Sequence, residues 1–176
     1  MIAPCVQHII KYKQSGTVLD LGTGTGKHAL YLAKQGFTVT AVDNDKLKVA
    51  ELRRRLKQEG VAIKVVRADA MRFAFTKKYD IIIATMLLHF LKPRQIGMLV
   101  ARIKAHTKSG GLNVVSAYTD IHPLGTKPYL FKKDELKNHY SGWHLLEYEE
   151  KKSRPFFSNS AGRLVQPHRA VIIAQK

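Results

Sequence analysis

Residues 18–26 combine a carboxylate with a run of glycines that a bound ligand can approach closely. Asp20 lies in a short apolar run, and Gly22, Gly24 and Gly26 follow it at alternate positions. Apolar side chains at helical spacing come next, so the stretch predicts a strand, a glycine turn and a helix. Glycine has no Cβ, which lets a ligand reach backbone N–H groups at the start of the helix. A carboxylate beside this turn favours a ligand with a positive ammonium or sulfonium group over a pyrophosphate.

Two other interpretations of the glycine turn are open at this stage. The dinucleotide fingerprint G-x-G-x-x-G needs its third glycine where this chain has Lys27, and Gly26 comes one residue early. This departure counts against NAD binding. A plain turn between a strand and a helix also uses glycine, but three glycines after an acid exceed what such a turn requires.

The pattern D-x-G-x-G-x-G resembles the first motif of class I S-adenosylmethionine-dependent methyltransferases. The resemblance implies that the loop, with Thr23 in it, wraps the methionine part of S-adenosyl-L-methionine. It also implies that Asp20 helps to hold the amino group of this cofactor. We therefore expect Asp20, Gly22, Thr23, Gly24 and Gly26 to belong to a cofactor site.

A second acid follows the next expected strand, residues 37–42. Asp43 lies about 20 residues beyond the glycine loop, where a βαβ unit places an acid against ribose hydroxyls. One carboxylate can accept hydrogen bonds from two hydroxyls at once. The alternative is that Asp43, Asn44 or Asp45 caps the next helix, and the two roles are compatible. We assign Asp43 and Asn44 to the expected cofactor site.

Two further strand ends complete this site. Residues 61–66 predict a third strand that leads to Asp69 and Ala70. In the methyltransferases that the chain resembles, an acid here binds the adenine amino group and the next backbone N–H reaches a ring nitrogen; a surface turn is the alternative. Residues 79–85 predict a buried strand whose end, Thr85, lies beside the transferred methyl in that family. Because carboxyl ends of parallel strands share one edge, we expect these groups to meet.

These strands predict an α/β fold of the doubly wound, Rossmann-like type. We expect a seven-stranded, mostly parallel sheet with helices between the first five strands and an antiparallel last strand. Helices are expected at 26–35, 45–59, 93–107 and 132–140, a turn at 109–111, and the later strands at 112–117, 143–149 and 169–174. The length of 176 residues fits a single methyltransferase domain over residues 1–176.

His89 closes the run Thr85-Met86-Leu87-Leu88-His89 after the fourth expected strand. It is a candidate catalytic base, although a lone histidine in an apolar run more often packs in a core. The run differs from the Asn-Pro-Pro-Tyr sequence with which related enzymes bind a planar amino group. This difference counts against methylation of the amino groups of adenine or glutamine.

The C-terminal half narrows the resemblance to one branch of these enzymes. The stretches at 128–136, 139–143 and 162–164 read PYLFKKDEL, HYSGW and GRL, and they resemble the tellurite-resistance methyltransferases. The resemblance implies a small methyl acceptor that is soft or oxyanionic, such as tellurite or selenite. Such an acceptor attacks the sulfonium methyl in line, so positioning supplies much of the acceleration.

An oxyanion acceptor needs cationic donors to hold it, and planar arginine forks suit this task. Arg163, His168 and Arg169 are therefore candidates for catalytic residues, with Lys127 behind them. Surface charge beside an edge strand is the alternative for each of them.

The chain carries a formal net charge of +17, from 30 Lys and Arg against 13 Asp and Glu. This charge raises RNA as a partner and an RNA methyltransferase as an alternative function. The basic residues are spread along the chain, which favours a generally basic surface that also attracts an anionic small molecule. A non-catalytic module that binds the cofactor is a third alternative.

The composition also indicates whether the protein has disulfides, a metal site or a membrane segment. The single cysteine, Cys5, excludes an internal disulfide and a thiolate metal site, so we expect no metal. The longest apolar stretch, residues 81–91, is too short to span a bilayer, and the first residues show no signal-peptide pattern. We expect a cytoplasmic enzyme without membrane contact, and the sequence leaves the oligomeric state open.

Overall fold

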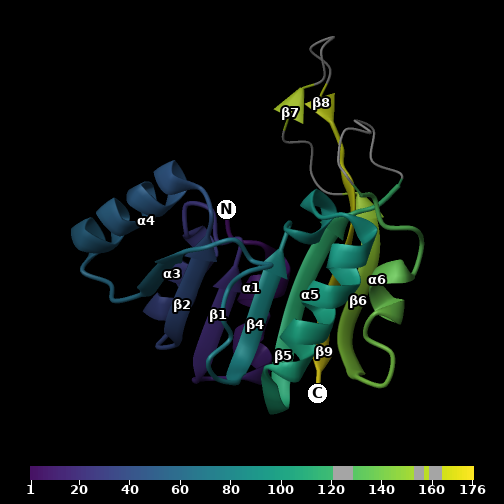
Figure 1. Cartoon of the computed structure of the whole chain (residues 1–176), viewed down its shortest axis with the longest axis horizontal. Coiled ribbons are helices and arrows are strands. Elements are labelled where there is room, and N and C mark those ends of the chain that lie inside the picture. Colours follow the sequence, from purple (N-terminus) through teal and green to yellow (C-terminus); the bar gives the residue numbers. More distant parts are fainter. Residues whose placement is uncertain (121–128, 153–156, 159–163) are drawn as a thin grey trace.

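The computed structural model describes residues 1–120, 129–152, 157–158 and 164–176, which contain a seven-stranded sheet. Its strands are β1 (Thr17–Leu21), β2 (Thr38–Asp43), β3 (Lys64–Arg67), β4 (Tyr79–Thr85), β5 (Thr107–Tyr118), β6 (His144–Lys152) and β9 (His168–Gln175). They lie in the order β3-β2-β1-β4-β5-β9-β6 (Figure 1). A separate antiparallel pair, β7 (Phe157–Ser158) and β8 (Leu164–Val165), was not predicted from the sequence.

The direction of the strands confirms the predicted fold class. Neighbours from β3 to β5 pair in parallel, whereas β9 runs antiparallel to both β5 and β6. The expected antiparallel last strand is therefore present. The strand order reverses between β1 and β4, and doubly wound sheets bind ligands beside such a switch point, at the carboxyl ends of the strands.

Helices cover both faces of the sheet, as a parallel sheet requires. On one face lie α1 (Pro4–Gln7), α2 (Ile9–Tyr12), α3 (Lys27–Lys34) and α4 (Lys46–Glu59). On the other face lie α5 (Pro93–Ala105) and α6 (Glu135–Asn138), and Figure 1 shows α5 in front of the sheet. Along β4, Ile81 and Ile83 pack with the first layer and Ile82 with the second, which is the alternation of a strand buried on both sides.

The connection from β3 to β4 departs from the prediction. The expectation of helices between all of the first five strands is wrong here, because the described residues 68–78 contain no helix and only a turn at 70–72. The guanidinium of Arg102 on α5 donates to the carbonyl oxygens of Met71 and Phe73. These backbone acceptors are thus satisfied by a distant side chain and need no helix.

Three boundaries also differ from the predicted ones. β3 begins at Lys64 and not at residue 61, because the N–H of Val61 still donates to the C-terminal carbonyl of Leu56 in α4. The turn predicted at 109–111 is an irregular part of β5, where Gly111 approaches the backbone of Asp80 too closely for a Cβ. The helix predicted at 132–140 is confined to α6, and a short 3-10 helix, η1 (Leu88–Phe90), follows β4.

Candidate cofactor site

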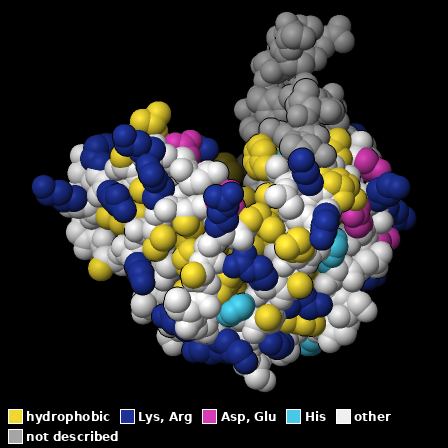
Figure 2. Space-filling model, in the orientation of Figure 1, with side chains coloured by type: hydrophobic (Ala, Val, Ile, Leu, Met, Phe, Trp, Pro, Cys, Tyr) yellow, Lys and Arg dark blue, Asp and Glu magenta, His cyan; other side chains and the backbone are white. Residues whose placement is uncertain are grey.

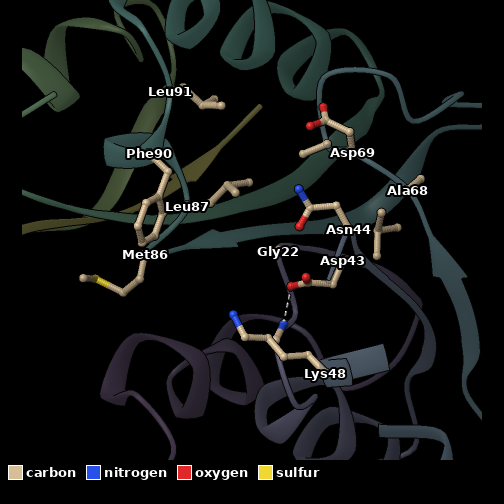
Figure 3. Close-up of a pocket in the computed structure, with 13 residues that line it drawn as sticks. Gly22, Asp43, Asn44, Lys48, Ala68, Asp69, Met86, Leu87, Phe90 and Leu91 are labelled. Atoms are coloured by element: carbon tan, nitrogen blue, oxygen red, sulfur yellow. Dashed lines mark hydrogen bonds between the residues drawn. The ribbon is translucent and has the colours of Figure 1, made fainter. Parts of the chain in front are cut away.

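A cavity of about 430 Å³ opens at the carboxyl ends of β1 to β4. Its lining residues are Gly22, Gly24, Val42, Asp43, Asn44, Lys48, Ala68, Asp69, Ala70, Met86, Leu87, Phe90 and Leu91. Figure 3 shows the polar side chains of Asp43, Asn44 and Asp69 on one side and apolar side chains that follow β4 on the other. Six of the ten residues that the sequence assigned to the cofactor therefore line one cavity. The other four are not lining residues: Asp20, Thr23, Gly26 and Thr85.

The three glycines of the loop have different tasks, although all of them have a positive φ. A Cβ on Gly26 would lie 2.2 Å from Leu52 Cδ1, so this glycine lets α4 pack against the loop. A Cβ on Gly24 would have no atom within 4 Å, because the residue faces the open cavity. Gly24 therefore provides the backbone surface that a ligand can approach, which is the property expected of a cofactor cradle.

Asp43 holds the glycine loop from the end of β2. Its Oδ2 accepts a hydrogen bond from the N–H of Gly24 at 2.7 Å, and its Oδ1 accepts one from the N–H of Asp45 at 3.0 Å. Each carboxylate oxygen keeps a lone pair for a ligand hydroxyl. Asp45 is the residue that caps α4, since its Oδ1 accepts from the N–H groups of Leu47 and Lys48. Asp43 is therefore not needed as the cap of α4, and its carboxylate holds the glycine loop and lines the cavity.

Asp20 is buried below the loop and does not line the cavity. Burial raises the pKa of its carboxyl to about 7, a hydrogen bond from Thr23 opposes this rise, and the nearby charge of Asp43 adds to it. The Thr23 hydroxyl donates to Asp20 Oδ2 at 2.7 Å, so the carboxylate also fixes the loop. A cation bound above the loop would favour the ionised form of Asp20.

The loop that carries Asp69 is held by a side chain that sequence reasoning missed. Arg102 donates to the carbonyl of Met71 at 2.6 Å and to that of Phe73, and its guanidinium stacks 4.8 Å from the ring centre of Phe75. Asp69 itself is exposed, and its Oδ1 accepts from the N–H of Met71 at 2.7 Å. In the sequence, Arg102 is one arginine of an amphipathic helix, which is too weak a signal to identify an anchor.

The residues after β4 form an apolar rim. Met86 has a φ of 56°, in the left-handed region that costs a non-glycine residue roughly 1–2 kcal/mol. Its N–H donates to the carbonyl of Ser116 at 2.8 Å, which holds this conformation. Leu87 lies over the loop, since a Cβ on Gly22 would be 3.0 Å from Leu87 Cδ1. Phe90 is 54% exposed at the edge of the cavity, a large apolar surface available to a flat ligand.

His89 does not line the cavity, and only 1% of it is exposed. Its ring packs between those of Phe90 and Tyr118, with ring centres 4.4 Å apart in each pair and ring planes tilted by 42° and 40°. The structure thus gives His89 the surroundings of a core residue and not those of a base that faces a ligand.

Thr85, at the end of β4, is bonded to a second residue that sequence reasoning missed. Nδ1 of His28, in the first turn of α3, lies 3.2 Å from the Thr85 hydroxyl oxygen. Both side chains are largely buried, with 8% exposure each. His28 directly follows Lys27 at the end of the glycine motif, and only this proximity in sequence hinted at a role.

The proposed acceptor residues lie at the same edge of the sheet but on different faces. His168 and Arg169 begin β9, whose antiparallel direction brings them beside the carboxyl end of β5 at Tyr118. Nδ1 of His168 lies 2.6 Å from the hydroxyl of Thr119. Successive side chains alternate along a strand, so Arg169 points toward the layer of α1 and His168 toward that of α5. Neither lines the cavity, and Arg163 and Lys127 lie outside the described residues.

The described part of the chain offers neither a cluster of metal ligands nor a membrane-spanning helix. No group of three or more His, Cys, Asp or Glu side chains suited to a metal ion occurs among these residues. None of the helices described here is both long enough and apolar enough to cross a membrane.

Comparison with known proteins identifies the family. A profile of the family described as tellurite resistance protein TehB matches residues 2–166. The chain is 30% identical over 162 residues to the probable S-adenosyl-L-methionine-dependent methyltransferase TehB of Haemophilus influenzae, which covers 90% of this chain and 57% of that protein. It is 32% identical over 161 residues to Hemagglutinin 1 of Eikenella corrodens, which covers 90% of this chain and 54% of that protein. The chain thus spans a little over half the length of these relatives.

Solved structures agree with this assignment. The crystal structure of TehB from Haemophilus influenzae matches with a TM-score of 0.92 at 29% identity, over 99% of this chain and 62% of that one. A methyltransferase of Burkholderia thailandensis, solved with bound S-adenosylhomocysteine, shares the fold with a TM-score of 0.75 at 21% identity, over 98% of this chain and 76% of that one. The chain belongs to the TehB family of tellurite resistance proteins and has the fold of S-adenosylmethionine-dependent methyltransferases.

Proposed function

We propose that the protein transfers a methyl group from S-adenosylmethionine to a small soft or oxyanionic acceptor of the selenite or tellurite kind. One observation carries the proposal. The open backbone of Gly24, the carboxylate of Asp43 and the exposed carboxylate of Asp69 lie along one cavity. This spacing suits a ligand with a methionine part, a ribose and a purine, bound in that order. When bound, the cofactor supplies an electrophilic methyl group on sulfur.

In this proposal the residues of the chain bind and orient, and none of them needs to form a covalent bond. Asp43 accepts hydrogen bonds from the two ribose hydroxyls while it keeps Gly24 in place. Asp69 accepts from the purine amino group, and the rim residues Leu87 and Phe90 shield the bound ligand from water. Orientation of two reactants is itself a large source of rate, equivalent to effective concentrations of about 10⁵ M or more.

The charge of the cavity also favours this ligand. Asp43 and Asp69 line it, and Asp20 lies directly below the loop. Lys48 is the single basic residue among the lining residues of this cavity, and its Nζ lies 3.6 Å from Asp45 Oδ2. A sulfonium and an ammonium group gain from such surroundings, whereas a pyrophosphate would meet several carboxylates.

Basic groups at the neighbouring sheet edge support an anionic acceptor. β6 runs in the same direction as β5, so Lys151 and Lys152 end beside Arg169 and His168 at the same edge. Burial raises the pKa of Cys5 and that of Tyr118, and the positive charge of Arg169 partly opposes this rise in both groups. Arg169 is therefore close enough to both side chains to interact with them electrostatically. Among the described residues, the buried Nε of Arg169 has no hydrogen-bond partner. A buried donor without a hydrogen-bond acceptor is a suitable group to bind an anion.

The first experiment measures methyl transfer from labelled S-adenosylmethionine to selenite, tellurite and small thiols. We expect label in at least one of these acceptors. The matched control is Gly24→Ala, whose Cβ would have no atom within 4 Å, so the added methyl hinders the cofactor and the positive φ of residue 24 is the main cost to the fold. Transfer at the wild-type level in this variant would show that the activity does not come from this site. Cofactor binding without transfer to any acceptor would instead identify a non-catalytic module.

RNA is the second candidate acceptor, because of the net charge of +17. The face in Figure 2 shows Lys and Arg side chains scattered without a continuous patch. Basic residues around α4 are partly neutralised, since Arg54 pairs with Glu51 at 2.7 Å and Lys34 with Glu59 at 2.6 Å. An RNA enzyme would bind RNA with a steep salt dependence and label it. Weak binding that vanishes at moderate salt without label in RNA would leave the small acceptor as the favoured substrate.

A further inference from the structure

His28 joins three separate parts of the chain beside the glycine loop. It lies in the first turn of α3, directly after the glycine loop. Its Nε2 accepts a hydrogen bond from the backbone N–H of Ala3 at 3.3 Å, and its Nδ1 lies 3.2 Å from Thr85 Oγ1. Both ring nitrogens therefore have hydrogen-bond partners, and His28 is only 8% exposed.

These two contacts determine where the ring carries its proton. A backbone N–H can only donate, so Nε2 must be an unprotonated acceptor. Burial lowers the pKa of His28 to about 4, so the ring is neutral near pH 7 and carries one proton. That proton is consequently on Nδ1, which donates to the oxygen of Thr85.

The direction of this bond fixes the hydroxyl of Thr85. Because Thr85 Oγ1 accepts from His28, its own hydrogen has to point elsewhere. Thr85 is the last residue of β4 and pairs with Ser116 of β5, and the next residue, Met86, lines the cavity. Thr85 thus ends a strand at the carboxyl edge of the sheet, where β5 separates it from the basic ends of β9 and β6.

We propose that His28 is a positioning residue, which holds the Thr85 hydroxyl as a hydrogen-bond donor aimed at the methyl acceptor. Thr85 then contributes a neutral donor to an anionic acceptor, next to the charged donors of the sheet edge. His28 itself is not a base, since both of its nitrogens are already bonded. The backbone of Ala3 has a part in the arrangement, because it selects the tautomer that makes Thr85 a donor.

The tautomer is measured directly by long-range ¹H–¹⁵N spectra of the full protein with labelled histidine. The His28 signals are identified by their loss in His28→Asn. We expect a neutral ring near pH 7 with the proton on Nδ1. The Thr85→Val variant should shift the Nδ1 signal and leave that of Nε2 in place. A proton on Nε2, or a charged ring, would overturn the proposal.

Two substitutions separate the two bonds of the ring. In His28→Asn the side-chain amide nitrogen falls near the position of Nδ1 and retains the bond to Thr85, whereas the longer side chain in His28→Gln reaches the N–H of Ala3. With selenite as acceptor, we expect kcat to fall about tenfold in His28→Ala, the loss of one hydrogen bond. We expect His28→Asn to recover most of this loss and His28→Gln to recover little of it. The exposed His144 provides the control, as His144→Ala should leave kcat unchanged.

Thr85 completes the test. Thr85→Val should lower kcat as much as His28→Ala, with KM for S-adenosylmethionine within about twofold, and the double variant should fall no further. Recovery in His28→Gln and not in His28→Asn would show that His28 acts only through Ala3, which would overturn the proposal. The kcat measurements on these variants rest on the acceptor class proposed above. If the wild type methylates none of selenite, tellurite and the small thiols, that acceptor class fails, and the spectra alone decide the role of His28.

Discussion

The two halves of the sheet hold their functional groups in different ways. In the half from β3 to β4, the carboxylates of the cavity accept from backbone N–H groups nearby: Asp69 from Met71, and Asp43 from Asp45 and from Gly24 of the adjacent loop. In the half from β5 to β6, the basic groups come from strands that are distant in sequence, and Arg169 and His168 point to opposite faces. In the function proposed above, cofactor binding would therefore depend mainly on local motifs, whereas acceptor recognition would depend on tertiary structure.

The largest effect is expected for the packing glycine of the local half. In Gly26→Ala the new Cβ would collide with Leu52, and the residue keeps a φ of 76°. Overpacking and the left-handed backbone together should lower the free energy of unfolding by about 2–4 kcal/mol, measured by chemical denaturation. Gly24→Ala is the control, and it should lose cofactor affinity with a smaller loss of stability. Equal stability losses in both would show that the two glycines do not differ as described.

The next effect concerns cofactor affinity. Asp43→Ala removes the acceptor of the Gly24 and Asp45 N–H groups as well as the contact proposed for the ribose. We expect binding of S-adenosylhomocysteine, measured by calorimetry, to weaken by about 1–3 kcal/mol. Arg169→Met, in the other half, should leave this affinity within about twofold, since the residue does not line the cavity. An unchanged affinity in Asp43→Ala would mean that the cofactor binds elsewhere.

Asp20 should make stability depend on pH. Its pKa, about 7 in the folded protein, lies above the ordinary value of 3.8, so the folded state holds its proton more tightly than the unfolded state. The free energy of unfolding should therefore fall as pH rises from about 5 to 7, by about 1 kcal/mol per pH unit, and level off above 7. Asp20→Asn should flatten this part of the pH profile. The opposite slope would show that the carboxyl is stabilised in its ionised form.

Cofactor binding should shift the same equilibrium, because a cation above the loop favours ionised Asp20. The affinity for S-adenosylmethionine should accordingly rise between pH 5 and 7, with protons released to the buffer, by up to about tenfold per pH unit. Calorimetry in buffers with different ionisation enthalpies measures this release. Proton uptake in this range, or a pH profile that Asp20→Asn does not change, would refute the role of Asp20.

A smaller effect is expected for the anchor of the Asp69 loop. Arg102→Met removes the donors of the Met71 and Phe73 carbonyls and frees the loop to move. Affinity for S-adenosylhomocysteine should fall about tenfold, as for the loss of a charged hydrogen bond. Arg94, an exposed residue of the same helix, is the control, and Arg94→Met should bind normally. A normal affinity in both variants would show that the loop needs no anchor.

The same contrast explains how much could be read from the sequence. Asp43 was predicted because it ends a strand about 20 residues beyond the glycine loop, and Asp69 because the family resemblance implies an acid after the third strand; the structure puts both on one cavity. Arg102 and His28 were missed because their partners lie 25 to 57 residues away, and no local pattern marks such bonds. Which face of the sheet each of His168 and Arg169 takes follows only from the packing of β9 between the two layers of helices.

The central claim is that the cavity between Gly24 and Asp69 binds an adenosyl cofactor. A crystal structure of the protein soaked with S-adenosylhomocysteine tests it most directly. We predict the homocysteine part over Gly24, the ribose hydroxyls on the carboxylate of Asp43 and the purine beside Asp69. A cavity that stays empty under saturating ligand, or that takes up a pyrophosphate from a nicotinamide dinucleotide instead, would contradict the account.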